Sequence, residues 1–444
     1  MLASLTVLFR QFVDEDLGCA SYLVGDREAG VAVLVDPAYA IEPYLDAATA
    51  EGVRIERVLE THTHADHLSG HGRLALEHDV PVSVHPLAEA EYAHDPLEDG
   101  DELAVGSVTL QVIHTPGHRP EHCAFAVGGE LVLTGDSLFV GDTARPDLAV
   151  AAVEGAEGLF HSLRRLAELP DGVGVYPGHV AGSLCGGSMS SERSSTIGAE
   201  RTGNASFGIP ELTAFIAQAS AISMPRPPNV QRIVELNRGP FVGAAEPLAQ
   251  VAFFEPALTV LDVRSAEEHF AGHVRGSLNV PLDGGSFATK AGFVLCADDR
   301  VAIDAASPED AARAARGLRS VGFLELSGSL VDPPRDEVSK PIDAAELDDL
   351  IAAKEVEIID VREMDERDQG YIPGTRHVPY RLLRKCFEEV AGGGKPLVTI
   401  CESGARAAIA ASVLRAAGVD ARPIVEGGIA TWRGTTVGFR RCGA

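Results

Sequence analysis

Histidines and aspartates crowd one short segment of the chain, "THTHADH" at residues 61–67. It contains His62, His64, Asp66 and His67. Alternate side chains of an extended segment point the same way, and a helix start turns the last two inward, so the four can converge. Such a set suits two zinc ions that make a hydroxide nucleophile, or one iron that handles dioxygen. The segment by itself leaves both chemistries open, and a surface cluster without metal is the third alternative.

Three later loops each offer a further ligand, which weakens the surface-cluster alternative. "HTPGH" places His118 on a glycine turn, and "LTGDS" and "YPGH" place Asp136 and His179 at strand ends. The sequence therefore predicts a metal site built from several loops. The histidines without such placement are expected to be surface or packing residues: His71, His78, His85 and His94. His114 and His122 stay open.

The first 240 residues alternate short apolar strands such as "VAVLVDP" with helical stretches such as "GLFHSLRRLAEL". This pattern is typical of a layered α/β domain. A repeat follows: "LDVRSAEEHFAGHVRGSLNVP" from residue 261 recurs as "IDVREMDERDQGYIPGTRHVP" from residue 359. We therefore predict three domains, at residues 1–240, 245–335 and 340–444.

The two repeat copies differ where a buried strand ends. The second copy has Cys401 there, at the start of "CESGAR", and the first copy has Asp304. A loop between a strand and a helix start directs backbone N–H groups and positive potential at a thiolate. We expect Cys401 to carry a terminal sulfur and Arg406 to act with it. The loop residues between them are the predicted substrate-binding residues: Glu402, Ser403, Gly404 and Ala405.

The composition limits the classes of partner that this protein is expected to bind. A formal charge of −28 repels phosphate backbones and anionic lipid, so nucleic acid and membrane surfaces are not expected and small molecules are. No apolar stretch approaches the roughly 20 residues of a membrane span, and the beginning of the chain reads as a strand. Seven scattered cysteines do not suggest a disulfide framework, which favours a reducing, cytoplasmic location.

Residues 1–240 resemble the metallo-β-lactamase fold, because His-x-His-x-Asp-His and the later His, Asp and His occur in order. The resemblance implies a four-layer αββα sandwich with metal at the strand ends. The C-terminal copies resemble rhodanese domains, through "IDVRE", "GYIPGTRHVP" and "CESGARAA" in the second, although Tyr371 stands where a histidine is common. In the first copy the loop reads "DAASPED", so that copy is expected to be catalytically dead.

The metallo-β-lactamase resemblance implies two alternative ligand sets. In a glyoxalase II-like thioesterase, His62, His64 and His118 hold one zinc, Asp66, His67 and His179 hold the other, and Asp136 bridges them. In an iron enzyme, His62, His118 and Asp136 hold one Fe(II) per N-terminal domain. His64, Asp66, His67 and His179 then surround the ligands.

Neighbouring segments favour iron. Ala65 stands where glyoxalase II-like sequences usually carry a bulky aromatic residue, and "GDSLFVGDTARPDL" and "YPGHVAGSLCGG" resemble persulfide dioxygenases fused to rhodanese domains. In that family a glycine usually occupies the position of Ala144. Arg145 is expected to pair with a substrate carboxylate, and Cys185 to lie near the pocket.

The resemblance implies that O2 oxidises a glutathione or coenzyme A persulfide to sulfite and thiol. Sulfane sulfur would pass between thiosulfate or sulfite and a thiol through a Cys401 persulfide. The alternatives are a dizinc thioesterase and a non-catalytic sulfur carrier or sensor. The identity of the thiol and a homo-oligomeric state are left open.

Overall fold

The computed structural model describes residues 7–146, 150–180, 190–220, 226–251, 258–391, 394–432, 434 and 436–438. It forms two compact units, Met1–Ala245 with Arg319–Phe323, and Glu246–Leu318 with Leu324–Ala444. Each unit is described by itself. In the part of the chain that is described, no helix combines the length and apolarity needed to cross a membrane.

Two six-stranded sheets form the centre of the first unit. The first sheet has the order β1-β2-β3-β4-β5-β6, with β1 Val7–Val13, β2 Ala20–Asp26, β3 Val31–Val35, β4 Arg54–Leu59, β5 Val82–Val84 and β6 Asp95–Pro96. The second has the order β14-β13-β10-β9-β8-β7, with β7 Glu102–Val105, β8 Val108–His114, β9 Cys123–Val127, β10 Leu131–Gly135, β13 Gly174–Pro177 and β14 Ser195–Thr196. A small hairpin joins β11 Leu138–Phe139 to β12 Asp142–Thr143.

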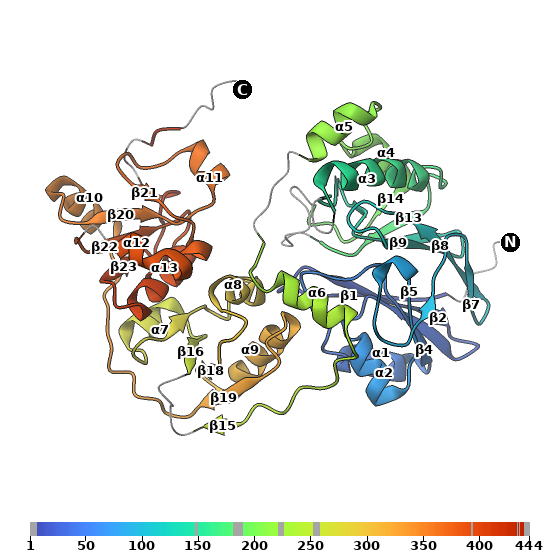
Figure 1. Ribbon diagram of the computed structural model, residues 1–444, viewed down its shortest axis with the longest axis horizontal. Coiled ribbons are helices and arrows are strands. Elements are labelled where there is room, and N and C mark those ends of the chain that lie inside the picture. Colours follow the sequence, from blue (N-terminus) through green and yellow to red (C-terminus); the bar gives the residue numbers. More distant parts are fainter. Residues whose placement is uncertain are drawn as a thin grey trace. The chain divides into compact units, whose positions relative to one another are not determined.

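Helices cover the outer face of each sheet (Figure 1). The helices of this unit are α1 Glu42–Glu51, α2 His71–His78, α3 Ala152–Leu166, α4 Ile197–Gly203, α5 Leu212–Ala219 and α6 Val230–Arg238, with the short η1 Pro86–Ala88. Residues of α1 and α2 share a core with the first sheet, and residues of α3 and α5 share another with the second. A third core lies between the sheets. These four layers confirm the predicted αββα sandwich.

Both faces of β2 are buried, which explains why its sequence does not alternate between apolar and polar residues. Leu23 belongs to the core under the outer helices, whereas Tyr22 and Val24 belong to the core between the sheets. Successive side chains of a strand point to opposite faces, so a strand in a middle layer needs apolar residues at every position.

The second unit contains two parallel sheets of the same strand order. The first has the order β15-β19-β18-β16-β17, with β15 Gln250–Val251, β16 Thr259–Asp262, β17 Leu278–Asn279, β18 Val301–Asp304 and β19 Leu326–Leu330. The second has the order β21-β20-β22-β23, with β20 Glu357–Asp360, β21 Arg376–His377, β22 Leu397–Ile400 and β23 Ala421–Pro423. Thus β16, β17, β18 and β19 correspond to β20, β21, β22 and β23, as the sequence repeat predicts.

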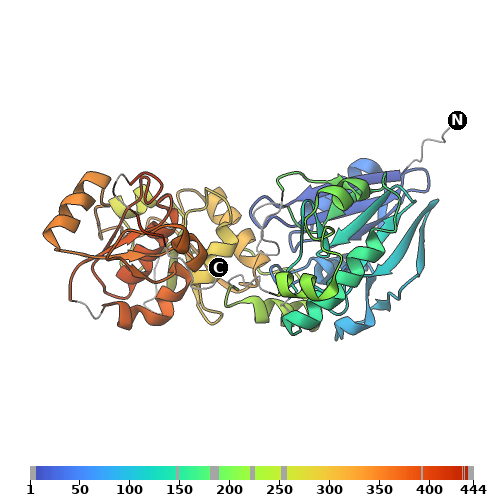
Figure 2. The ribbon, with the colours of Figure 1, turned by 90° about the horizontal axis from the view of Figure 1, so that it is seen from above.

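Helices flank these strands (Figure 2). They are α7 Ala266–Ala271, α8 Phe287–Val294, α9 Pro308–Ser320, α10 Ala344–Ala353, α11 Met364–Gln369, α12 Leu383–Ala391 and α13 Ala405–Ala416, with η2 Tyr380–Leu382. An α/β architecture is therefore present in both units. The three-domain division and the rhodanese character of the first copy stay predictions.

Candidate metal site and thiol loop

His62, His118 and Asp136 form one buried cluster in which the potential ligand atoms lie within 4.8 Å of one another. Nε2 of His118 lies 3.5 Å from Oδ2 of Asp136, and Nε2 of His62 lies 4.0 Å from the same oxygen. That oxygen is buried and accepts no hydrogen bond. A buried carboxylate oxygen without a donor is costly. Two imidazoles and a carboxylate therefore fit a divalent metal ion.

Hydrogen bonds determine which nitrogen of each histidine is free to bind a metal. The Thr61 hydroxyl donates to Oδ2 of Asp36 (2.8 Å), so its oxygen can only accept from Nδ1 of His62 (2.8 Å). Nδ1 of His118 likewise donates to the carbonyl of Arg145 (3.0 Å). In both rings Nδ1 carries the proton, and Nε2 keeps the lone pair that a metal needs.

The protonation states of these three side chains also suit metal binding. Burial lowers the pKa of His62 well below its ordinary value, and burial lowers the pKa of His118 as well. Burial alone would raise the pKa of Asp136, but His179 and His118 outweigh it and hold that pKa below its usual range. Neutral imidazoles and an ionised carboxylate are the forms that bind metals.

His179 bridges two carboxylates. Its Nδ1 lies 2.7 Å from Oδ1 of Asp136, and its Nε2 lies 2.7 Å from Oδ2 of Asp66. Because an ionised carboxylate only accepts, both ring nitrogens donate and neither offers a lone pair. This geometry suits a residue that orients Asp136 better than a metal ligand.

A second cluster consists of His64, Asp66 and His67, whose potential ligand atoms again lie within 4.8 Å of one another. Both ring nitrogens of His64, and Nε2 of His67, are buried without a hydrogen bond. Nδ1 of His67 lies 3.2 Å from Oδ1 of Asp66. These nitrogens leave room for a second cation, although the dizinc alternative groups His179 rather than His64 with Asp66 and His67.

Two buried carboxylates that the sequence analysis did not single out surround His64. Its Nε2 lies 3.4 Å from Oδ1 of Asp36 and 3.2 Å from Oε2 of Glu60. Oε1 of Glu60 accepts from Ser69 Oγ (2.6 Å) and from His71 Nδ1 (3.1 Å). Each carboxylate directly follows a buried strand, β3 or β4. A carboxylate directly after a strand is visible in the sequence, so this position could have identified both residues as candidates.

These contacts change the pKa values of Glu60 and His64. Burial would raise the pKa of Glu60, but His64, whose Nε2 lies 3.2 Å away, and the hydrogen bond from His71 outweigh it and lower the pKa to about 2. Burial would lower the pKa of His64, but Asp36 and Glu60 raise it well above its ordinary value. Glu60 is therefore held as a carboxylate.

The structure also shows the contacts of His114 and His122, whose role the sequence left open. Nε2 of His122 accepts from the backbone N–H of Asp136 (2.9 Å), and its Nδ1 bonds to Thr115 Oγ1 (2.8 Å). Both nitrogens are thus committed. His114 stacks on His85 with ring centroids 4.3 Å apart. Neither open histidine joins the metal cluster.

Of the two predicted substrate residues in this unit, Arg145 and Cys185, the described part of the chain includes Arg145. Arg145 is buried, and its carbonyl orients His118. Ala144 packs against Phe139, and it is not among the residues with positive φ, so this turn does not require the family's usual glycine. Cys185 lies in residues 181–189, outside the described part of the chain.

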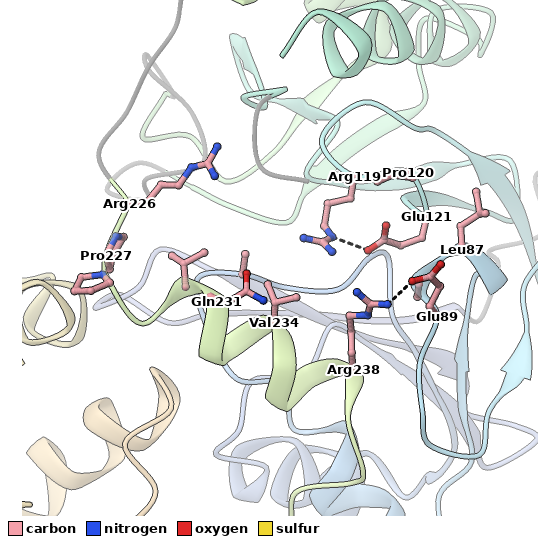
Figure 3. Close-up of a pocket in the computed structure, with 14 residues that line it drawn as sticks. Leu87, Glu89, Arg119, Pro120, Glu121, Arg226, Pro227, Gln231, Val234 and Arg238 are labelled. Atoms are coloured by element: carbon pink, nitrogen blue, oxygen red, sulfur yellow. Dashed lines mark hydrogen bonds and ion pairs between the residues drawn. The ribbon is translucent and has the colours of Figure 1, made fainter. Parts of the chain in front are cut away.

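A cavity of about 590 Å³ opens beside the metal loop, which we define as residues 61–69 (Figure 3). Arg119 pairs there with Glu121 (2.6 Å), and Arg238 pairs with Glu89 (2.5 Å). The remaining lining residues are Ala65, Leu87, Ala88, Pro120, Arg226, Pro227, Pro228, Val230, Gln231 and Val234. The size is that of a small-molecule site, and its three arginines suit an anionic group.

The thiol loop encloses Cys401, which is 1% exposed. The backbone N–H of Gly404 donates to its Sγ over 3.1 Å. Gly404 has φ +102°, and a Cβ there would lie 2.2 Å from the carbonyl oxygen of Val425. Only glycine therefore allows the loop to turn under the sulfur and begin α13.

Salt bridges hold the charged residues of this loop. Arg406 donates to both carboxylate oxygens of Glu366 (2.6 and 2.5 Å), and this bonding raises the pKa of Arg406. Glu402 pairs with Arg362 (3.0 Å). Ser403 and Ala405, by contrast, are exposed at the mouth of the loop.

In the first copy, Asp304 occupies the strand end that corresponds to Cys401. Its carboxylate is fully buried and pairs with Arg335 (2.6 Å), which comes from the segment that joins the copies. The copies are further connected by Arg384, which pairs with Asp299 (2.8 Å). Asp304 offers no thiol, and its contacts are those of a structural residue.

Family models match both ends of the chain. The model of the metallo-β-lactamase superfamily matches residues 14–179, and the rhodanese-like domain model matches residues 343–435. Persulfide dioxygenase ETHE1 of Bos taurus is 30% identical over 238 residues, covering 52% of this chain and 87% of that protein. The hydroxyacylglutathione hydrolase of Alkalilimnicola ehrlichii is 36% identical over 161 residues, covering 36% of this chain and 60% of that protein.

A solved metallo-β-lactamase from Staphylococcus aureus covers 73% of this chain and 99% of its own, with 29% identity and a TM-score of 0.68. The fold and the His/Asp cluster thus define a metal-binding protein of the metallo-β-lactamase superfamily. Within that superfamily, the chain belongs to the ETHE1-like persulfide dioxygenase family and carries a C-terminal rhodanese domain.

Proposed function

We propose that the N-terminal unit oxidises a low-molecular-weight thiol persulfide with O2, yielding sulfite and the thiol, at one Fe(II) held by His62, His118 and Asp136. The observation that carries this proposal is the three-donor face. Its Nε2 atoms and one carboxylate oxygen are free, while His122 and His179 have both ring nitrogens committed elsewhere. When bound, Fe(II) supplies open coordination positions and redox chemistry.

The surrounding residues hold this face in place. Asp36 and Thr61 orient His62, and the carbonyl of Arg145 orients His118. The backbone bond to His122 and the contact with His179 orient Asp136. Such supporting bonds prevent the ligand rings from rotating, which keeps the remaining positions open.

The second C-terminal copy would transfer sulfane sulfur. A persulfide on Cys401 gives its outer sulfur to sulfite, so that thiosulfate forms and the Cys401 thiolate returns; the reverse step accepts sulfur from thiosulfate. The N–H of Gly404 and the nearby guanidinium of Arg406 are placed to stabilise negative charge at the loop. A domain that passes sulfur to sulfite would consume the product of a domain that releases sulfite, which accounts for their fusion in one chain.

Substrates are proposed to be glutathione or coenzyme A persulfide, O2, and thiosulfate or sulfite. The strong negative charge still argues against nucleic acid and membrane surfaces as partners. A cytoplasmic location fits the scattered thiols.

Metal analysis of anaerobically purified protein, combined with oxygen uptake on glutathione persulfide, tests the proposal. We expect about one iron per chain and oxygen consumption that depends on it. Two tightly bound zinc ions in active protein, without oxygen uptake, would contradict it.

A dizinc thioesterase is the second candidate. The unbonded Nε2 of His67 favours it, as does the similarity to a hydroxyacylglutathione hydrolase. It predicts two zinc ions per chain and hydrolysis of glutathione thioesters. The two ring nitrogens of His179 bond to Asp136 and Asp66, which disfavours the dizinc alternative because His179 then has no lone pair for a zinc ion.

A further inference from the structure

One amide side chain connects the last helix of the first unit to the metal loop. Asn237 on α6 is 3% exposed, and its Nδ2 donates to the carbonyls of His64 (3.0 Å) and His67 (2.9 Å). Its Oδ1 accepts from the backbone N–H of Ser69 (2.9 Å). The side chain thus makes three hydrogen bonds to the backbone of the segment that carries His64, Asp66 and His67.

These bonds restrain the loop because they act on its main chain. An amide has two donors and can accept through its oxygen, so Asn237 uses both donors and the acceptor on one short segment. If the amide were lost, two buried carbonyls would lose their donors, which favours a rearranged loop. Asn237 is therefore a positioning residue for the metal site.

The same helix lines the cavity beside the loop. Gln231, Val234 and Arg238 project from α6 into the cavity, where Arg238 pairs with Glu89 (Figure 3). Ala65, between His64 and Asp66, lines the same cavity. A molecule in this cavity thus contacts both α6 and the loop that α6 holds.

The lining indicates what such a molecule carries. Its cations are Arg119, Arg226 and Arg238, and no lysine is among the lining residues. Arg119 and Arg238 already pair with Glu121 and Glu89, but each guanidinium has five N–H donors, so donors remain that can bind the carboxylate of a ligand. A carboxylate-bearing amino-acid or peptide thiol fits this mixture of charges.

We propose that α6 couples the cavity to the metal site: a carboxylate-bearing thiol bound against Arg238 and Gln231 slows loss of the metal, and Asn237 transmits the effect. The proposal deepens the proposed function and rests on it for the identity of the thiol. A ligand that restrains α6 favours the state in which Asn237 holds the loop. If the thiol raises the equilibrium affinity for the metal by some factor, the metal must raise the affinity for the thiol by the same factor.

The test is the rate at which Fe(II)-loaded full-length protein gives up its metal to a chelator under anaerobic conditions. Reduced glutathione is the carboxylate-bearing probe, and coenzyme A is the phosphate-bearing comparison. Glutathione at ten times its Kd should slow release by about tenfold if it binds only the state in which Asn237 holds the loop. If coenzyme A alone slowed release, the carboxylate assignment would be wrong, and if neither did, so would the coupling.

Asn237→Asp keeps the side-chain shape but removes both donors. Without thiol, this variant should release its metal about tenfold faster, which corresponds to a loss of about 1.4 kcal/mol of hydrogen bonding. Glutathione should no longer slow the release. Asn229→Asp is the matched control: Asn229 precedes the same helix, is 3% exposed, and donates to the carbonyl of Val321 instead (2.7 Å). Its release rate should stay at the wild-type value.

Arg238→Ala provides a second variant in case Asn237→Asp does not fold. It should reduce the glutathione effect at least severalfold, and an undiminished effect would overturn the coupling. Wild-type release from Asn237→Asp would overturn the positioning role. Zinc in place of iron, or absent oxygen uptake, would contradict the proposed function while leaving the release comparison valid, because either metal can be followed.

Discussion

The backbone N–H of Asp136 donates to Nε2 of His122 over 2.9 Å. This bond consumes the ring nitrogen that would otherwise be available for a metal, although the His122 ring lies only 5.1 Å from that of His62. His122 therefore helps to orient Asp136 through its backbone and does not offer this nitrogen to a metal. This hydrogen bond distinguishes His122 from the proposed ligands His62 and His118, although all three side chains are buried.

The three-donor face predicts a clear hierarchy among substitutions. His62→Ala, His118→Ala and Asp136→Ala should each abolish both iron binding and oxygen uptake, because each removes one of the three proposed ligands. His122→Ala should retain iron with an affinity reduced about 10- to 100-fold, as expected for a supporting residue. Metal content and oxygen uptake are measured on the same samples. Equal losses in all four variants would contradict this hierarchy.

The second cluster gives a prediction that separates iron from the dizinc alternative. Single alanine substitutions of His64, Asp66 or His67 should weaken iron retention or activity partially, because we propose that these residues surround the ligands and do not bind the iron themselves. The measurement is metal content after dialysis against a weak chelator. Loss as complete as in His62→Ala would identify the substituted residue as a ligand.

The two C-terminal copies should differ completely in sulfur transfer. Cys401→Ser should eliminate thiosulfate:thiol transferase activity and leave the iron reaction running, since only the sulfur carrier is removed. With a persulfide substrate, the wild type should then yield some thiosulfate, and the variant sulfite alone. Asp304→Ala is the control in the first copy and should keep transferase activity; if it removed that activity, the assignment of the copies would be wrong.

Substitution of Arg406 should reduce transferase activity partially in the same assay. Its substitution by alanine should weaken thiosulfate use by roughly 1.5 to 3 kcal/mol, the contribution of a charge-assisted hydrogen bond. Because Arg406 also pairs with Glu366, a Glu366→Gln variant separates loss of that pair from loss of the cation. Glu366→Gln should retain more thiosulfate use than Arg406→Ala.

Glu60 should make stability depend on pH. Its pKa falls from an ordinary 4.5 to about 2 in the folded protein, so its contribution is fully present above about pH 4.5 and is lost as the pH falls toward 2. Glu60→Gln should lower the free energy of unfolding of the metal-free protein by roughly 1 to 3 kcal/mol at neutral pH, and less in acid. Denaturant unfolding at several pH values measures this. Glu157→Gln, on an exposed position of α3, is the surface control.

The sequence by itself determined the fold class, the repeat and the candidate ligands. Apolar strands, turns and the motifs after them are local patterns, and the repeat is visible by comparing the chain with itself. His62, His118 and Asp136 could be nominated because each follows a strand or turn, and strand ends of one layer meet at a shared edge. The difference between Cys401 and Asp304 is likewise a property of single positions.

Only the tertiary structure decided which histidine nitrogens are free, and which polar residues support them. His114 and His122 look alike in sequence, and a bond to a backbone N–H fourteen residues away distinguishes them. Asn237 reaches His64 across 173 positions of the chain, which no local pattern reports. Hydrogen bonds depend on the distance and direction of individual atoms, and these are established only when distant segments pack together.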